Sequence, residues 1–192
     1  MKLIVGLGNP GKIYINSRHN IGFSVIRALS QFFKISFKKD GDSFCLSGKA
    51  KFKNQNIILA MPLTFMNLSG LGVSALLKKY KVDLDNLLIV CDDLDLGLGR
   101  LKIRPYGSSA GHRGLKSIIE YLNSDGFPRL RIGIGRPALK KDAAEYVLSA
   151  FIKKEKEQIK EIVARACDCC QVWITKGITE SMNIFNQRSE VQ

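Results

Sequence analysis

The chain has 192 residues, of which 45% are hydrophobic and 24% charged, and this globular composition argues against disorder. No apolar run reaches the roughly 18 residues of a membrane span, and the first residues are too few and too weakly apolar for a signal peptide. Thirty Lys and Arg against 17 Asp and Glu give a net charge of +13. That excess favours a polyanionic partner such as a nucleic acid, although a basic surface without such a partner is the alternative.

Apolar periodicity and turn residues predict strands that alternate with helices along the chain. In chain order we expect a strand over 3–5, a helix over 21–33, a hairpin of 43–52 and 56–60, a helix over 67–80, strands over 87–90 and 100–104, a helix over 112–122, a strand over 130–134, and helices over 154–175 and 178–188. This order predicts a single α/β domain over residues 1–192. Its sheet should be twisted, mixed and mostly parallel, with helices on both faces.

Two elements carry more specific expectations. The helix over 67–80 should begin at the capping residues Asn67 and Ser69. Its buried residues should be Leu71, Ala75, Leu76 and Tyr80. The strand over 100–104 alternates basic and apolar residues, so one of its faces should be buried and the other positively charged.

The five cysteines are odd in number, in a chain too large to need disulfides, so reduced thiols and a cytoplasmic location are expected. Cys167, Cys169 and Cys170 could suggest a metal site. Structural zinc requires a second pair of ligands at suitable spacing, and none is present. The better interpretation is packing of small apolar side chains on an amphipathic helix.

Two short motifs suggest other enzymes. Residues 6–11 match the G-x-G-x-x-G pattern of dinucleotide-binding proteins. However, the residues that follow do not read as a helix, and Pro10 removes a backbone N–H that could bind pyrophosphate. Residues 107–111 match the G-x-S-x-G pattern of serine hydrolases, but His112 is the only histidine after Ser109 and no acid separates the two.

A third constellation is spread along the chain. Asn9 and Asp92 follow two predicted strands, His19 lies in the loop after the first, and Asn67 opens a helix. The carboxyl ends of parallel strands share one edge of a sheet, so these side chains can converge. A histidine can take a proton near pH 7, a carboxylate can orient it, and asparagine amides can bind a carbonyl. A structural histidine and a strand-end cap remain the simpler alternatives.

Five ordered motifs now give the chain a recognisable pattern. They are 6–11 with Tyr14 and Arg18-His19-Asn20, Pro62 with 64–70, Asp92-Asp93-Leu94-Asp95-Leu96, Gly111-His112-Arg113-Gly114-Leu115-Lys116, and 129–135. Together they resemble the bacterial peptidyl-tRNA hydrolase family over nearly the whole chain. The resemblance implies hydrolysis of the ester between a peptide and tRNA, by a cytoplasmic monomer that needs neither cofactor nor metal and that binds no membrane.

The resemblance also implies roles for particular residues. His19 would be the general base that activates water, Asp92 would orient it, and Asn9 would place the water and the ester. Asn67 would bind the peptide backbone and support the site, with Met66 and Tyr14 lining the cleft. The tRNA phosphates would be bound by Lys102, Arg104 and Arg131, which agrees with the positive strand face.

One position departs from the family pattern. The family commonly has Asn after the histidine of the 111–116 motif, whereas this chain has Arg113. Arg only donates hydrogen bonds, whereas Asn both donates and accepts, so the role of this position in substrate binding is open. A non-catalytic RNA-binding protein on the same fold is the alternative from another functional class.

Overall fold

The computed structural model describes residues 1–137 and 142–187 of the chain. Its centre is one sheet of seven strands in the order β2-β3-β4-β1-β5-β7-β6. The strands are β1 (Lys2–Gly6), β2 (Lys38–Asp40), β3 (Cys45–Phe52), β4 (Gln55–Pro62), β5 (Leu87–Asp93), β6 (Leu101–Arg104) and β7 (Arg129–Gly133). The strands β4, β1, β5 and β7 are parallel, whereas β2, β3 and β4 pair antiparallel, as do β6 and β7. The predicted mixed, mostly parallel α/β sheet is confirmed.

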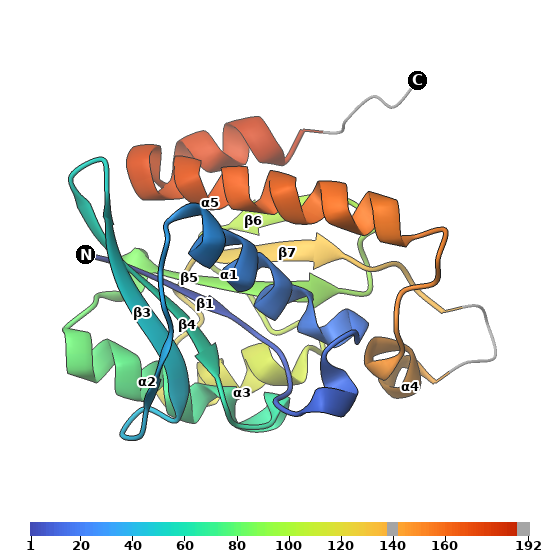
Figure 1. The fold of residues 1–192 in the computed structure, drawn as a ribbon, viewed down its shortest axis with the longest axis horizontal. Helices are drawn as coiled ribbons and strands as arrows, with labels where there is room; N and C mark the ends of the chain where they lie inside the picture. The colour runs from blue at the N-terminus through green and yellow to red at the C-terminus, as the bar shows by residue number, and fades with distance from the viewer. Residues whose placement is uncertain (138–141, 188–192) are drawn as a thin grey trace.

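Helices cover both faces of this sheet (Figure 1). They are α1 (Ile21–Phe32), α2 (Ser69–Tyr80), α3 (Arg113–Leu122), α4 (Ala143–Leu148) and α5 (Lys156–Phe185), with short 3-10 turns at Lys12–Tyr14, Arg18–Asn20, Met66–Leu68 and Leu84–Asn86. Alternate side chains of each strand enter opposite cores because successive residues point to opposite faces. In β1, Ile4 packs with α1 and α5, whereas Leu3 and Val5 pack with α2 and α3.

The first turn of α1 lies unusually close to the sheet because two glycines face each other there. A Cβ on Gly6 would overlap the carbonyl oxygen of Gly22, and a Cβ on Gly22 would overlap that of Val90. Only glycine permits this approach of helix and strand. The turn that precedes α1, Arg18–Asn20, is thereby held at the carboxyl ends of β1 and β5.

The expectations for the helix over 67–80 need correction. The helix α2 starts at Ser69 after the turn Met66–Leu68, and its apolar buried residues are Val73, Leu76 and Leu77. Of the four residues expected to be buried, only Leu76 is buried. The reason is that α3 packs along Gly70 and Val73 rather than along the side of α2 that carries Leu71 and Ala75. No side chain caps α2. Ser69 instead donates its hydroxyl to the Met66 carbonyl oxygen at 2.8 Å.

The C-terminal helices were predicted with a break between 175 and 178. The structure has one element, α5, that is interrupted at Gly177, whose φ of 83° lies outside the helical region. Glycine adopts this backbone conformation without strain. Two shorter elements, β2 and α4, were not predicted, and each spans six residues or fewer. No helix among the described residues is long and apolar enough to cross a membrane.

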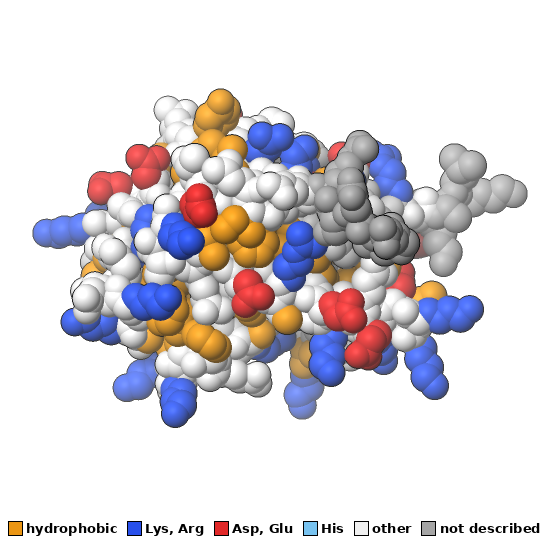
Figure 2. Space-filling view, turned by 90° about the horizontal axis from the view of Figure 1, so that it is seen from above, with side chains coloured by type: hydrophobic (Ala, Val, Ile, Leu, Met, Phe, Trp, Pro, Cys, Tyr) orange, Lys and Arg blue, Asp and Glu red, His pale blue; other side chains and the backbone are white. Residues whose placement is uncertain are grey.

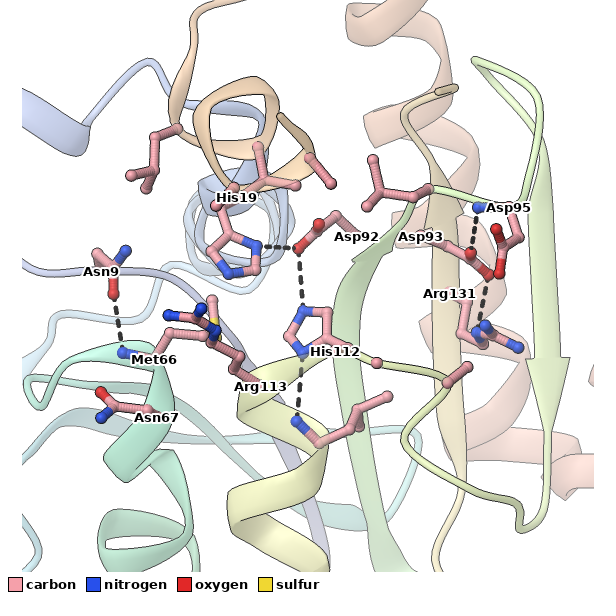
Figure 3. A pocket seen from close by; sticks show the side chains of 18 of the residues that line it. Asn9, His19, Met66, Asn67, Asp92, Asp93, Asp95, His112, Arg113 and Arg131 are labelled. Atoms are coloured by element: carbon pink, nitrogen blue, oxygen red, sulfur yellow. Dashed lines mark hydrogen bonds and ion pairs between the residues drawn. The ribbon is translucent and has the colours of Figure 1, made fainter. Parts of the chain in front are cut away.

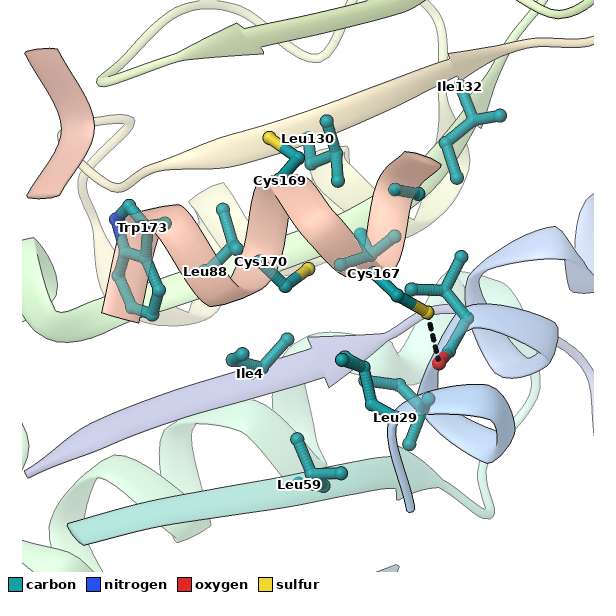
Figure 4. Close-up of a cluster of buried hydrophobic side chains, with 14 of the residues drawn as sticks. Ile4, Leu29, Leu59, Leu88, Leu130, Ile132, Cys167, Cys169, Cys170 and Trp173 are labelled. Carbon is teal, nitrogen blue, oxygen red and sulfur yellow. Dashed lines mark hydrogen bonds between the residues drawn. The ribbon is translucent and has the colours of Figure 1, made fainter. Parts of the chain in front are cut away.

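The cysteine cluster lies in the core under α5 (Figure 4). Cys167, Cys169 and Cys170 are buried beside Trp173 and the sheet residues Ile4, Leu88 and Leu130. Burial raises the pKa of the Cys167 and Cys169 thiols to about 12, so both stay protonated. The packing interpretation of these cysteines is therefore confirmed.

Candidate active site

A cavity of about 630 Å³ opens at the carboxyl ends of β1 and β5. Its wall comes from the segments that follow these strands, from the turn Met66–Leu68, from the first residues of α3, from α4, and from Arg131 of β7. Seven of the predicted site residues line it: Asn9, His19, Met66, Asn67, Asp92, Arg113 and Arg131. Segments far apart in the sequence thus meet at the carboxyl ends of the parallel strands, where these side chains were predicted to converge.

Asp92 is the centre of the site (Figure 3). Its side chain is only 2% exposed, and one oxygen, Oδ1, lies 2.7 Å from Nδ1 of His19 and 3.0 Å from Nε2 of His112. Burial alone raises the pKa of Asp92, but His112 and His19 together hold it well below its ordinary value. The carboxylate is therefore ionised and accepts a hydrogen from both imidazoles.

His112 is held in one tautomer by the start of α3. It is the N-cap residue of that helix, and its Nδ1 accepts the backbone N–H groups of Gly114 at 3.1 Å and Leu115 at 3.2 Å. An acceptor nitrogen carries no hydrogen, so the ring is neutral and its proton is on Nε2. His112 is thus a fixed donor to Asp92.

Sequence reasoning missed this role of His112. The available signal was its place at the start of the predicted helix over 112–122, where a side chain that accepts hydrogen bonds is favoured. Its position in the 111–116 motif was a second signal.

His19 contacts Asp92 through its other ring nitrogen, Nδ1, whereas His112 uses Nε2. Its Nδ1–H donates to Asp92, which leaves the lone pair of Nε2 on the opposite side of the ring. His19 lines the cavity, so that lone pair is the basic atom of the site. Asp92 also stabilises the imidazolium that forms if Nε2 takes a proton. The pair can therefore work as a general base with its orienting carboxylate.

Asn9 is fixed from two sides. Its Oδ1 accepts the backbone N–H of Met66 at 2.8 Å. The Asn20 side chain binds the Asn9 backbone at both ends, accepting from its N–H at 2.8 Å and donating to its carbonyl oxygen at 3.0 Å. Because Oδ1 is engaged, the amide nitrogen of Asn9 is the group that can donate into the cavity. Sequence reasoning did not foresee the bracing by Asn20.

The remaining predicted lining residues differ in position. Met66 is buried in the cavity wall, and Asn67 beside it is exposed at the mouth. Tyr14 does not line the cavity, contrary to expectation. Its ring packs edge-on against Phe65 with centroids 6.5 Å apart, and Phe65 is the residue that reaches the cavity. Tyr14 supports the wall from behind.

The three predicted tRNA-binding residues share one face of the β6/β7 ribbon. Lys102 lies opposite Arg131, and Arg104 lies opposite Arg129. Arg131 lines the cavity and forms an ion pair with Asp93 at 2.8 Å, whereas Lys102 and Arg104 lie outside it. Arg129 is buried and donates to backbone oxygens of Gly107, Ser108 and Asp125. Arg129 therefore anchors the segment before α3 rather than facing solvent.

The turn that carries His19 is also tied to the outer wall of the cavity. Arg18, the residue before His19, is 4% exposed and pairs with Glu155 at 2.6 Å. Its guanidinium lies over the rings of Tyr146 and Phe151, at 4.3 and 4.6 Å from their centroids. Its backbone N–H donates to Ser149. The turn that carries His19 is thus clamped to α4 and the segment after it.

Two alternative chemistries do not fit this geometry. A 3-10 turn, Lys12–Tyr14, rather than a long helix follows the glycine-rich corner, so the dinucleotide motif lacks its helix. Ser109 does not line the cavity, and both ring nitrogens of His112 are engaged by Asp92 and by α3. Ser109 therefore has no base beside it.

His19, Asp92 and His112 also form a cluster with the atom types that bind metals. A metal on Nε2 of a neutral His112 would require the ring hydrogen on Nδ1, where two backbone N–H groups already point. Only His19 and Asp92 would then remain as ligands. The donor set does not fit a metal ion with three or four protein ligands.

The open α/β sheet holds a paired histidine and carboxylate at its strand ends, an arrangement that general-base hydrolysis can use. A sequence model of the family described as peptidyl-tRNA hydrolase matches residues 3–192. A peptidyl-tRNA hydrolase of Geobacillus thermodenitrificans is 46% identical over 97% of this chain and 100% of its own length. A peptidyl-tRNA hydrolase of Aquifex aeolicus is 46% identical over 98% of this chain and 97% of its own length.

A crystal structure of peptidyl-tRNA hydrolase from Acinetobacter baumannii superposes with a TM-score of 0.91 at 32% identity. The superposition covers 97% of this chain and 94% of the crystallised chain. The chain belongs to the peptidyl-tRNA hydrolase family. The resemblance seen in the five motifs is confirmed.

Proposed function

We propose that His19 is the general base with which this chain hydrolyses the ester bond of peptidyl-tRNA. The activity itself follows from membership of the family, whose members at 46% identity extend over nearly the whole chain. The products are a free peptide and a free tRNA. The reaction belongs to the carboxylic-ester hydrolases.

The chemistry assigns one step to each residue. Nε2 of His19 takes a proton from a water molecule as the water oxygen attacks the ester carbonyl. Asp92 orients His19 and stabilises the imidazolium that forms. The amide nitrogen of Asn9 donates to the carbonyl oxygen, and Asn67 binds the peptide backbone at the mouth. The imidazolium then returns its proton to the ribose oxygen that leaves.

One observation carries this proposal: His19 and His112 share the same oxygen of a buried carboxylate. A buried ionised carboxylate is costly unless it is well bonded. A protein that only binds RNA has no need of such a base at the strand ends. The arrangement favours the enzyme over a non-catalytic RNA-binding protein.

The decisive assay is release of N-acetylphenylalanine from N-acetylphenylalanyl-tRNA by the purified chain. We expect multiple turnovers that are insensitive to a serine-reactive phosphonate, because no nucleophilic serine takes part. Tight binding of tRNA without release would support the RNA-binding alternative instead. Inactivation through Ser109 would contradict the assignment of His19.

We further propose that Lys102, Arg104 and Arg131 bind tRNA phosphates. Lys102 and Arg131 are directly opposite on β6 and β7, and Arg104 is two residues along the same face, so their charges form one stripe beside the cavity. Figure 2 shows one face of the molecule, over which basic side chains are spread without one dominant patch. The stripe adjoins the cavity through Arg131, which lines it.

Replacing Lys102 with Gln should weaken tRNA binding and flatten its salt dependence by about one unit of slope, because one phosphate contact is lost. The measurement is the dissociation constant of deacylated tRNA across a salt series. Lys38→Gln is the matched control, since β2 and β6 are the opposite edges of the sheet. Equal slopes for the two variants would remove Lys102 from the tRNA path.

We also propose that His112 is a positioning residue for Asp92. Replacing it with Asn should keep the helix cap, since Asn is a favoured N-cap residue, but the shorter side chain would no longer donate to Asp92. We expect kcat to fall roughly 10- to 100-fold, because a hydrogen bond to a charged group contributes about 1.5–3 kcal/mol. His112→Ala should lose the cap as well, and with it about 1 kcal/mol of stability.

Steady-state kinetics and thermal unfolding of both variants test the two roles of His112 separately. An unchanged kcat in His112→Asn would show that Asp92 needs only His19.

We propose that the chain acts as a monomer in the cytoplasm. The five cysteines are free and buried, which suits a reducing compartment. The cavity is built from segments of one chain, so no second copy is needed to complete it.

A further inference from the structure

Nearly all of the charged side chains that line the cavity form hydrogen bonds or ion pairs. Asp92 binds the two histidines, Asp93 pairs with Arg131, and Asp95 pairs with Arg136. Asp142 accepts the backbone N–H of Ala144 at the start of α4. Among the described residues that line the cavity, Arg113 is the cation without a hydrogen bond or ion pair.

The side chain of Arg113 enters the reactive part of the cavity. Arg113 is the first residue of α3, directly after His112, and its side chain is exposed. Figure 3 shows its guanidinium extending from α3 past Met66 towards the space between Asn9 and His19. Those two residues are the proposed carbonyl donor and the proposed base. The guanidinium therefore approaches the position of the ester carbonyl.

The local structure does not explain a cation at this position. The backbone N–H groups at the start of a helix carry partial positive charge, so a positive side chain in the first turn is disfavoured. No acid of α3 lies in its first turn to offset this cost. Departures from a local preference are expected where function requires them. A ligand that carries negative charge would supply the missing partner.

We propose that Arg113 is a catalytic residue that binds the acyl oxygen as it becomes negative and then binds the carboxylate of the released peptide. The proposal rests on the function assigned above. Water attack turns a neutral carbonyl into an oxyanion, and loss of the ribose oxygen leaves a carboxylate. A guanidinium binds both anions more strongly than the neutral ester, so its effect is greatest in the transition state and in the product.

A tRNA phosphate is the other anion that could bind here. Of the proposed phosphate stripe, Lys102 and Arg104 lie outside the cavity on β6, and Arg131 is paired with Asp93. Arg113 instead points at the two groups that converge on the carbonyl. The geometry therefore favours the acyl group as its ligand, and the phosphate becomes an outcome of the test.

The experiment compares N-acetylphenylalanine with N-acetylphenylalaninamide, which has nearly the same shape but a neutral carboxamide in place of the carboxylate. Binding of each to the folded protein is measured by NMR titration, without turnover. The wild type should prefer the carboxylate about tenfold, and Arg113→Gln should remove that preference. Arg113→Lys should retain part of it. In parallel, kcat for N-acetylphenylalanyl-tRNA should fall roughly 100-fold in Arg113→Gln with little change in KM.

Lys116→Gln is the matched control, because Lys116 is an exposed cation one turn further along α3 that does not line the cavity. It should leave both readouts unchanged. A carboxylate preference that survives in Arg113→Gln would overturn the proposal. So would a loss confined to tRNA affinity with a flatter salt slope, which would assign Arg113 to a phosphate.

Failure of the proposed function itself gives a different pattern. In that case the wild type would not release the acetylated amino acid, whatever the binding data for Arg113. Retention of full turnover by a His19 variant would likewise reject the base without affecting the carboxylate comparison.

Discussion

His19→Ala should lose turnover of N-acetylphenylalanyl-tRNA by on the order of 100- to 10,000-fold, the range that a general base contributes. The reason is that Nε2 of His19 is the basic atom directed at the cavity, whereas both nitrogens of His112 are engaged. In the wild type, Asp92 should not limit kcat at mildly acidic pH, because its lowered pKa keeps this carboxylate ionised.

Two measurements make the His19 result interpretable. The dissociation constant for deacylated tRNA should stay within about twofold of wild type, since the side chain of His19 contacts Asp92 and His112 rather than the basic side chains of the proposed phosphate stripe. Thermal unfolding should show that the buried turn Arg18–Asn20 still folds. Near-normal turnover in a folded variant would mean that another group activates the water.

Asp92→Asn should reduce kcat by on the order of 100- to 10,000-fold with little change in KM. The amide is nearly the same shape, and its oxygen can still accept from both histidines. Its orientation is fixed, because the Nε2–H of His112 requires an acceptor. What is lost is the negative charge that stabilises the His19 imidazolium. The comparison is made by steady-state kinetics on N-acetylphenylalanyl-tRNA.

Asp95→Asn is the control for Asp92→Asn. It removes the same charge from the same cavity, but Asp95 pairs with Arg136 and contacts neither histidine. We expect at most a severalfold change in kcat. If both variants lost activity equally, the effect would come from the general charge of the cavity rather than from the contact with His19.

The fold was largely predictable because its signals are periodic. Alternation in the strands and 3.6-residue spacing in the helices place each apolar side chain in one of two cores. The phase of α2 was wrong because its contact surface depends on Gly70, which lets α3 approach, and that approach is a tertiary property. The short helix α4 carries few periodic positions and escaped detection.

The candidate site was predictable where topology governs it. Asn9 and Asp92 both end parallel strands, so their convergence follows from the sheet, and the resemblance placed Asn67 and the position of Arg113 in the substrate-binding site. His112 could not be assigned, because its role depends on a tautomer that only the backbone of α3 determines. Tyr14 was misplaced because the position of its ring depends on Phe65.

Because Arg18 and His19 are consecutive residues, the contacts of Arg18 limit how the sequence can diverge. Arg18 is a buried cation whose charge is balanced by Glu155, 137 residues away. Loss of either partner alone would leave an uncompensated buried charge and strain the turn that holds the base. The two positions should therefore change together over evolutionary time. Natural variation at the outer wall is constrained by the chemistry at the centre, even though Glu155 does not line the cavity.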